Sequence, residues 1–277
     1  MFGFSVSTRC STTEKKKMLF NAFTRATSRP FFNQALLSLV LASTGWLLHH
    51  TAQADTVIET TRIIYPEARR DVSFKITNAS KTAPSFVQMW LDDGNANSTP
   101  EEISTPFSLT PPIARLKADS SQVVRVVFTG DALPADKESV FWFNMLEVPP
   151  KSKEETRLSF AVRTRIKMFY RPKAVKGDPL EWMDKVTWKV VKGEKGWMAE
   201  ANNPSPFHMS MFSISLGTDG KYDVVADGGM VNPKDKALFP LTGTEKLNKV
   251  TQKTLRIEYV NDYGGATTKE LPIVLNN

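Results

Sequence analysis

Hydrophobic and polar positions alternate along most of the chain from residue 55 onward, as they do in strands that bury one face. In residues 71–78, the apolar Val72, Phe74 and Ile76 fall on one side and the polar side chains between them fall on the other. No segment in this part repeats its apolar residues at helical spacing over a useful length. The pattern therefore predicts a chain built almost entirely from strands.

Several other segments share this strand character, and two of them are dense enough in apolar residues to predict central strands buried on both faces. These two are residues 121–129 and 139–148. The remaining expected strands are residues 85–91, 157–169, 186–191, 197–201, 207–216, 254–260 and 269–275. Clusters of aspartate, asparagine, glycine and proline mark the turns between them. Many short strands with regular turns are typical of β-sandwiches, and this length suits two of them.

The first 54 residues have a different character. Residues 35–48 form an apolar run, which follows Arg25 and Arg29 and precedes Ala52-Gln53-Ala54. A basic segment, a short apolar run and a small-x-small site together make a secretory signal peptide. We therefore expect export and cleavage after Ala54. An uncleaved membrane anchor is the alternative, but the run is shorter than the ~20 residues that a membrane span needs.

Removing this leader changes the charge balance. The 277 residues include 36 basic and 29 acidic side chains, a formal net charge of +7. Six basic residues and one acid lie in the leader, which leaves 30 and 28, or a net charge of +2. The balance argues against nucleic acid as a partner. The stretch before the apolar run is long for a signal peptide and contains lysines at positions 15–17. Starting at Met18 would give a leader of ordinary length, so Met1 and Met18 both remain open as the true start.

The chain after residue 54 has little of the chemistry that enzymes and metal sites need. Cys10 and two histidines leave with the leader, so no cysteine remains and His208 is the last histidine. Disulfides and cysteine-based zinc sites are excluded. The phosphate-loop, nucleophile-elbow and zinc-protease motifs are missing too. We expect no enzymatic activity, no cofactor and no bound metal, and we interpret His208 as a structural or surface residue.

Residues 157–169 carry the most informative pattern. The apolar members of one face are Leu158, Phe160, Val162 and Ile166, and Thr164 interrupts them. Arginine and lysine occupy the opposite face. One interpretation is the last strand of a sandwich, facing its own core. The other is an edge strand that offers its apolar face to another protein, because strand addition takes affinity from main-chain bonds and specificity from alternate side chains.

Five segments resemble sequence signatures of the periplasmic pilus chaperones, the PapD-like family. They are residues 61–66 (TRIIYP), 133–144 (LPADKESVFWFN), 165–172 (RIKMFYRP), 203–207 (NPSPF) and 261–265 (NDYGG). They stand in the family's order, and the resemblance covers residues 56–277. The short connection of residues 149–156 and the absence of a cysteine pair resemble the branch with a short F1-G1 loop.

The resemblance implies an all-β fold of two immunoglobulin-like β-sandwich domains in a boomerang arrangement, after a cleaved signal peptide. The leader would be residues 1–54, the N-terminal domain with the donor strand residues 55–172, and the C-terminal domain residues 173–277. The implied function is that of a periplasmic chaperone. Such a protein binds and stabilises pilin subunits by donor-strand complementation and delivers them to an outer-membrane usher for pilus assembly.

The resemblance also implies roles for individual residues. Arg62 and Lys167 would anchor the C-terminal carboxylate of the subunit, which suits two cations that can make charge-assisted hydrogen bonds. Glu138, Arg171 and Asp262 match charges that link the two domains in the family. The donor residues that fill the subunit's groove would be Leu158, Phe160, Val162 and Ile166. Thr164 leaves the full extent of the donated strand open.

Two other classes of exported β protein remain as alternatives at this point. One is a fimbrial structural or adhesive subunit, although such subunits usually have one incomplete sandwich and an N-terminal extension. The other is a secreted β-sandwich hydrolase or carbohydrate-binding protein. The sequence predicts no membrane span in the mature protein. It leaves open the pilin, the pilus type, the surface that meets the usher and self-association of the free protein.

Overall fold

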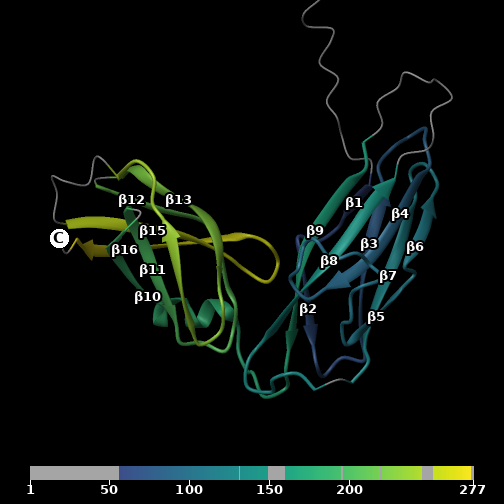
Figure 1. Cartoon of the computed structure of the whole chain (residues 1–277), viewed down its shortest axis with the longest axis horizontal. Coiled ribbons are helices and arrows are strands. Elements are labelled where there is room, and N and C mark those ends of the chain that lie inside the picture. Colours follow the sequence, from purple (N-terminus) through teal and green to yellow (C-terminus); the bar gives the residue numbers. More distant parts are fainter. Residues whose placement is uncertain are drawn as a thin grey trace, which may run out of the picture. The chain divides into compact units, whose positions relative to one another are not determined.

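The computed structural model describes residues 56–130, 132–148, 160–194, 196–218, 220–244 and 252–275. All of them belong to the unit Gln53–Asn277. They form strands β1 to β16 and one short 3-10 helix, η1 (Figure 1). The prediction of an all-β chain is confirmed. In this described part of the chain, no helix is long and apolar enough to cross a membrane.

The first nine strands form a sandwich of two sheets. One sheet has the order β1-β3-β7-β5, and the other has the order β2-β9-β8-β4-β6. The strands are β1 (Thr56–Ile58), β2 (Arg62–Pro66), β3 (Asp71–Asn78), β4 (Ser85–Asp92), β5 (Phe107–Thr110), β6 (Ile113–Leu116), β7 (Ser121–Phe128), β8 (Ser139–Val148) and β9 (Val162–Arg171). All paired strands are antiparallel except β2 and β9, which run parallel.

An aromatic cluster fills the core of this sandwich. Tyr65 of β2 stacks on Tyr170 of β9 at 5.9 Å between ring centroids, and it meets Phe107 of the opposite sheet edge-on at 5.4 Å. The Tyr65 hydroxyl donates to the Arg70 carbonyl and accepts from the Phe128 amide, at 3.1 and 2.9 Å. Burial of large rings with satisfied polar ends stabilises the core. The cluster therefore holds β2 and the last part of β9 firmly together.

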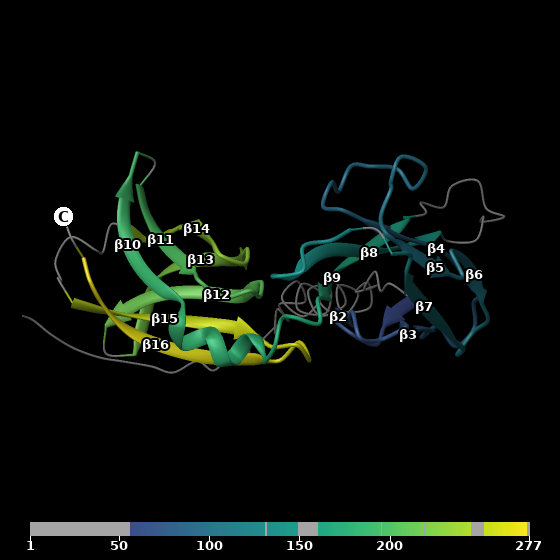
Figure 2. The same ribbon diagram turned by 90° about the horizontal axis from the view of Figure 1, so that it is seen from below.

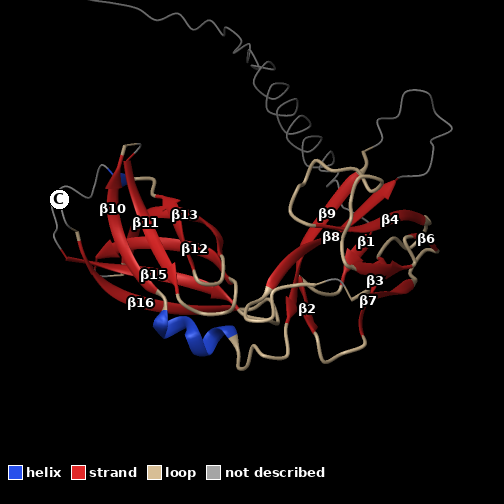
Figure 3. Ribbon diagram, turned by 60° about the horizontal axis from the view of Figure 1, so that its bottom comes forward, coloured by secondary structure: helices blue, strands red, loops and turns tan. Residues whose placement is uncertain are grey.

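The remaining strands form a second sandwich, which the helix η1 (Pro179–Lys185) precedes. Its sheets have the orders β10-β11-β14 and β13-β12-β15-β16 (Figure 2). The strands are β10 (Thr187–Gly193), β11 (Gly196–Asn203), β12 (Met209–Thr218), β13 (Lys221–Val231), β14 (Asp235–Pro240), β15 (Gln252–Val260) and β16 (Ala266–Val274). The helix lies just before β10 in the chain (Figure 3). Asp178 caps η1 by accepting from the Leu180 amide at 2.8 Å.

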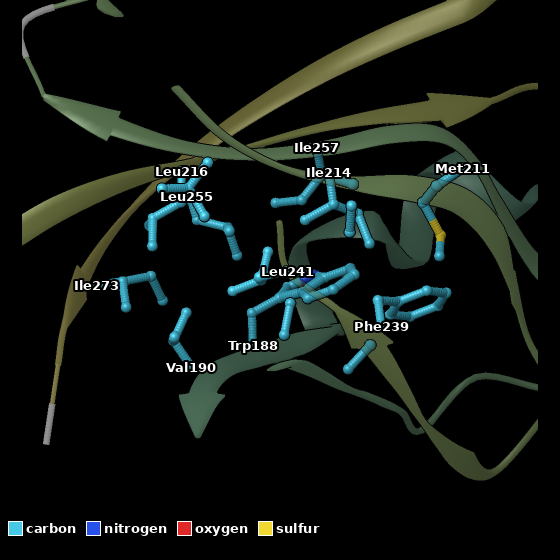
Figure 4. Close-up of a cluster of buried hydrophobic side chains, with 14 of the residues drawn as sticks. Trp188, Val190, Met211, Ile214, Leu216, Phe239, Leu241, Leu255, Ile257 and Ile273 are labelled. Atoms are coloured by element: carbon cyan, nitrogen blue, oxygen red, sulfur yellow. The ribbon is translucent and has the colours of Figure 1, made fainter. Parts of the chain in front are cut away.

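The second core lies between these two sheets (Figure 4). Ile214 and Ile257 are fully buried on one side of it, and Trp188 and Phe239 face them from the other sheet. The Trp188 indole donates to the Tyr259 hydroxyl at 2.9 Å, which satisfies both buried polar atoms. Each sandwich therefore has its own core, in agreement with the prediction that the chain forms two β-sandwiches.

The structure also contains elements that the sequence pattern does not reveal. β13 and β14 escaped prediction because Gly228 and Gly229 interrupt the alternation of β13 and a charged turn opens β14. The prediction that residues 121–129 are buried on both faces is wrong. β7 is central in its sheet, but Val123 is 50% exposed, so the strand buries only one face.

One edge of β9 is only partly paired with a neighbouring strand. On one side, β8 pairs with β9 from Val162 to Tyr170. β2 pairs with the other side of β9 only from Lys167 to Arg171. Among the described residues, the segment Val162–Ile166 therefore has a strand on one side only, and we call it the free edge.

Candidate functional site

The free edge ends at a pair of cationic side chains. Arg62 is the first residue of β2, and it lies directly across from Lys167 in the parallel register of β2 and β9. On the other side, Lys167 lies across from Trp142 of β8. A groove of about 330 Å³ opens here, which we call the anchor groove. Its lining residues are Thr61, Arg62, Trp142, Arg165, Ile166 and Lys167.

The two cations are poorly compensated. Arg62 donates one hydrogen bond, from Nη1 to the Val260 carbonyl at 3.3 Å, while its buried Nε has no partner. Within the described part of the chain, neither Arg62 nor Lys167 forms an ion pair, and Lys167 forms no hydrogen bond through Nζ. Unpaired buried donors are costly, because nothing replaces the water that they lose. The anchor groove is therefore suited to an anion that two cations share.

The electrostatics of the groove lead to the same conclusion. The pKa of Lys167 lies below its usual value, first because the side chain is buried and then because Arg62 and Arg165 are close. Burial also lowers the pKa of Arg62, against the attraction of Asp262 and Glu138. A carboxylate between Arg62 and Lys167 would relieve this repulsion and accept hydrogen bonds from both.

The predicted donor residues lie along and beside the free edge. Phe160 and Val162 are 66% and 39% exposed, so each can still bury apolar surface against a partner. Ile166 is partly buried and packs against the core of the first sandwich. Thr164 is partly buried between them. Leu158 lies outside the described residues, as does the start of the expected strand, and β9 itself begins at Val162 and continues to Arg171.

A second group of charged side chains joins the first sandwich to the second. The Arg171 guanidinium donates to Glu138 at 2.9 Å and, with two nitrogens, to Asp262 at 2.9 and 3.1 Å. The structure thus brings together the three residues that the sequence analysis grouped. These acceptors outweigh the effect of burial and raise the pKa of Arg171. The three side chains form a hydrogen-bonded network that includes both β9 and the turn after β15.

His208 is a fourth member of this network. It is 7% exposed, and its backbone amide donates to Glu138 at 2.8 Å, while ring Nδ1 lies 3.3 Å from the same carboxylate oxygen. The sequence interpretation of His208 as structural agrees with this position, but its partner was not predicted. The preceding turn of residues 203–207 supplies the geometry, because the Asn203 side chain donates to the Phe207 and Asn232 carbonyls.

The turn of residues 261–265 places Asp262. The Asn261 side chain accepts from the backbone amides of Tyr263 and Gly265, at 3.0 and 2.8 Å. Gly264 has a φ of +83°, and an added Cβ would lie 2.0 Å from the Thr61 hydroxyl. Only glycine fits such a left-handed and crowded position. The signature residues Asn261, Gly264 and Gly265 thus fix the turn that carries Asp262, and Gly264 brings the turn against Thr61.

A third polar cluster lies on the outer face of the same sheet, and the sequence analysis missed it. Asp92, at the end of β4, is fully buried and accepts from Arg165 and from the Asn144 amide. Arg163 donates to the Asn144 carbonyl oxygen and stacks over Trp90. Alternation correctly placed the two arginines on one face, but their partner stands in a turn-like Asp-Asp-Gly-Asn segment that gave no sign of it.

The described residues contain no group of three or more histidine, cysteine, aspartate or glutamate side chains that could hold a metal ion. What the structure offers instead is an unpaired strand edge beside a cationic groove, on a protein of two immunoglobulin-like sandwiches. These features are typical of a protein that binds another protein by strand addition.

Comparison with known proteins gives the family. Residues 55–176 match the model of the pili and flagellar-assembly chaperone, PapD N-terminal domain, and residues 181–271 match the pili assembly chaperone PapD, C-terminal domain. The chain therefore belongs to the PapD-like family of periplasmic pilus assembly chaperones. The prediction of a chaperone is confirmed over the alternatives of a fimbrial subunit and a β-sandwich hydrolase.

Individual relatives support this assignment. The chain is 36% identical to the chaperone protein FimB/FhaD of Bordetella pertussis, over 86% of this chain and 95% of that one. It is 35% identical to the probable fimbrial chaperone YadV of Escherichia coli, over 85% and 97%. Two solved structures are similar. The structure of the YadV chaperone has a TM-score of 0.67 and 35% identity, over 79% of this chain and all of that one. The structure of the Pseudomonas aeruginosa CupB2 chaperone has a TM-score of 0.65 and 33% identity, over 78% of this chain and all of that one.

We expect Arg171→Ala to lower the free energy of unfolding by about 3–5 kcal/mol, because the buried Glu138 would lose its cation. The side chains of Glu138 and Arg171 are 2% and 15% exposed, so water cannot easily replace the lost partner. Urea unfolding followed by tryptophan fluorescence measures the change. Lys81→Ala, which removes an exposed pair with Asp119, is the control and should have little effect. A loss below about 1 kcal/mol for Arg171→Ala would mean that the network is merely a surface contact.

Proposed function

We propose that this protein captures pilin subunits in the periplasm by lending them the free edge of β9, and that it delivers them to an outer-membrane usher for pilus assembly. One observation carries the proposal: a strand edge with no partner among the described residues ends at a groove with two cations, Arg62 and Lys167, that form no ion pair there. A strand that pairs with this edge gains main-chain hydrogen bonds. A carboxylate at its end satisfies the cations.

We infer the direction of the captured strand from the same pairing. Its carboxyl end must lie at Lys167, while its body must lie along Val162–Ile166, where β9 has no neighbour on that side among the described residues. The strand therefore runs parallel to β9 and continues the line of β2. Because β2 begins at Arg62, it closes the end of the track. A terminal carboxylate fits there, whereas a chain that continued would meet β2.

Alternate side chains of the donor segment would complete the subunit's core. We assign this role to Leu158, Phe160, Val162 and Ile166. The exposure of Phe160 and Val162 supports the assignment. Burying a fully exposed side chain of this kind contributes about 1.5–3 kcal/mol before ordering costs, and Phe160 would gain a larger share of this than the less exposed Val162. The partial burial of Ile166 suggests a smaller contribution at the end next to the anchor groove.

The same proposal includes the organisation of the chain. Residues 1–54 act as a signal peptide that is cleaved after Ala54, residues 55–172 form the domain that binds the subunit, and residues 173–277 form the second domain. Arg171, Glu138 and Asp262 link the two domains through the hydrogen bonds described above. The protein binds and hands over its partner without catalysing a reaction and without a cofactor.

Removal of the anchor tests this function. We expect Lys167→Ala to weaken binding of a pilin peptide with a free terminal carboxylate by about 30-fold or more, because a buried charged contact is lost. Amidation of the peptide should weaken binding to the native protein to a similar extent. Isothermal titration of the protein purified from the periplasm measures both effects.

The matched control is Lys189→Ala, which removes an exposed lysine of β10 in the other sandwich. Its affinity should equal that of the native protein. Binding that is indifferent to both the Lys167 side chain and the terminal carboxylate would contradict the anchor. It would leave a chaperone that holds its subunits in another way.

The lowered pKa of Lys167 predicts a particular pH dependence. Above that pKa the free protein has a neutral lysine, so binding a carboxylate must also take up a proton, and affinity falls as pH rises. The fall should begin below the pH at which an ordinary lysine titrates. Lys167→Arg should abolish it, because an arginine remains charged. A native affinity that stays constant up to pH 10.5 would contradict this account.

A further inference from the structure

Alternation of apolar side chains cannot by itself prevent a captured strand from binding two residues out of register. A slip of one residue turns every side chain of the captured strand to the opposite face, and burial excludes it. A slip of two residues restores the same faces and moves the strand by only about 6.6 Å along β9. The position of the terminal carboxylate must then distinguish the correct register from the slipped one. This question rests on the proposed function and concerns the same site.

The chain itself carries cations at the slipped positions. Arg165 and Arg163 precede Lys167 by two and four residues, so all three lie on one face of β9. Arg165 also lines the anchor groove together with Lys167. An arginine binds a carboxylate at least as well as a lysine does, because its planar group can donate two parallel hydrogen bonds. A free Arg165 would therefore be a competing anchor, two residues out of register.

Arg165 is not free in the structure. It donates from Nε to one oxygen of Asp92 at 3.0 Å, and from Nη2 to the other oxygen. Its guanidinium lies 4.6 Å from the centre of the Trp142 ring. The two-pronged pair takes up Nε and Nη2 and leaves only Nη1 of Arg165, and a second carboxylate that approached this nitrogen would be repelled by Asp92.

Arg163 is occupied in the same way. Its Nε and Nη2 donate to the Asn144 side-chain oxygen at 3.0 and 2.7 Å, and its Nη1 donates to the Ala96 carbonyl at 2.6 Å. Asp92 lies 3.6 Å from the same guanidinium. Of the three cations on this face, Lys167 is the one with no partner among the described residues.

Asp92 is built to remain in place. Its side chain is fully buried, and the Asn144 amide and the Gly94 backbone hold it at 2.7 and 2.8 Å. Burial by itself would raise the pKa of Asp92, but hydrogen bonds from Arg165, Asn144 and Gly94 outweigh that effect and lower it. The carboxylate thus stays ionised and cannot swing away to release Arg165.

We propose that Asp92 sets the register of the captured strand. By occupying Arg165, it prevents the terminal carboxylate from binding two residues too early and leaves Lys167, with Arg62, as the anchor. Asp92 is a positioning residue, since it acts through Arg165 and does not itself touch the subunit. It therefore determines which residues of the subunit meet the donor side chains.

Disulfide trapping can read the register directly. Thr164→Cys places a thiol on the free edge, and the probe is a synthetic peptide of alternating valine and serine with a free terminal carboxylate and one cysteine at a varied position. A disulfide forms only when the Cα atoms lie about 4.4–6.8 Å apart, so a slip of two residues selects a different peptide. Cys10 leaves with the proposed leader, so the added thiol is the only one in the mature protein.

With Asp92 intact, trapping should peak at a single peptide position. Asp92→Asn should add a second peak for a cysteine two residues nearer the carboxyl end, and Asp92→Asn/Arg165→Gln should remove that peak. A structural role for Asp92 would reduce overall binding without moving the peak. A folded Asp92→Asn variant that traps only at the native position would overturn the proposal.

A second variant retains Asp92, so the test does not depend on the folding of Asp92→Asn. In Lys167→Ala the proposal predicts no trapping at the slipped position, because Arg165 is still occupied. Carboxylate-dependent trapping there would show that Asp92 does not block Arg165, and would also overturn the proposal. Failure of the proposed function looks different: the native protein would then bind the amidated peptide as well as the free acid.

Discussion

The parallel pairing of β2 with β9 is the constraint on which the rest of the structure depends. It begins at Arg62 opposite Lys167 and extends only toward the end of β9. Because the pairing stops there, the preceding part of β9 has a strand on one side only within the described chain. The same register places two cations side by side where the pairing begins. The open edge and its cationic end are thus two results of one strand register.

The core explains how such a site can be held open. Tyr65 and Tyr170 lie on β2 and β9 and pack against Phe107 of the opposite sheet, so the paired part of the two strands is fixed by buried rings. The cations near this site differ in whether they have a carboxylate partner. Arg171 and Arg165 each have a carboxylate partner, whereas Arg62 and Lys167 have none among the described residues. The paired arginines therefore stabilise the fold, whereas Arg62 and Lys167 remain available to bind an anion.

Much of this arrangement could be predicted from the sequence. Alternation gave most strands, and signature segments gave the positions of Arg62, Lys167 and the three charges Glu138, Arg171 and Asp262. Their distances and partners required the structure. The buried pair of Asp92 and Arg165 could not be predicted, because an aspartate in an Asp-Asp-Gly-Asn segment looks like an ordinary turn residue and its partner is 73 residues away. β13 was missed because two adjacent glycines interrupt its alternation of polar and apolar residues.

The central claim is that a subunit strand adds to the edge of β9 between Val162 and Ile166. Amide hydrogen exchange of the free and peptide-bound protein tests this claim most directly, because exchange slows where a backbone amide gains a hydrogen bond. The account predicts that a peptide with a free carboxylate protects amides of this segment, and that the amidated peptide at the same concentration protects them much less. Protection elsewhere on the protein, with this segment unchanged, would contradict the account.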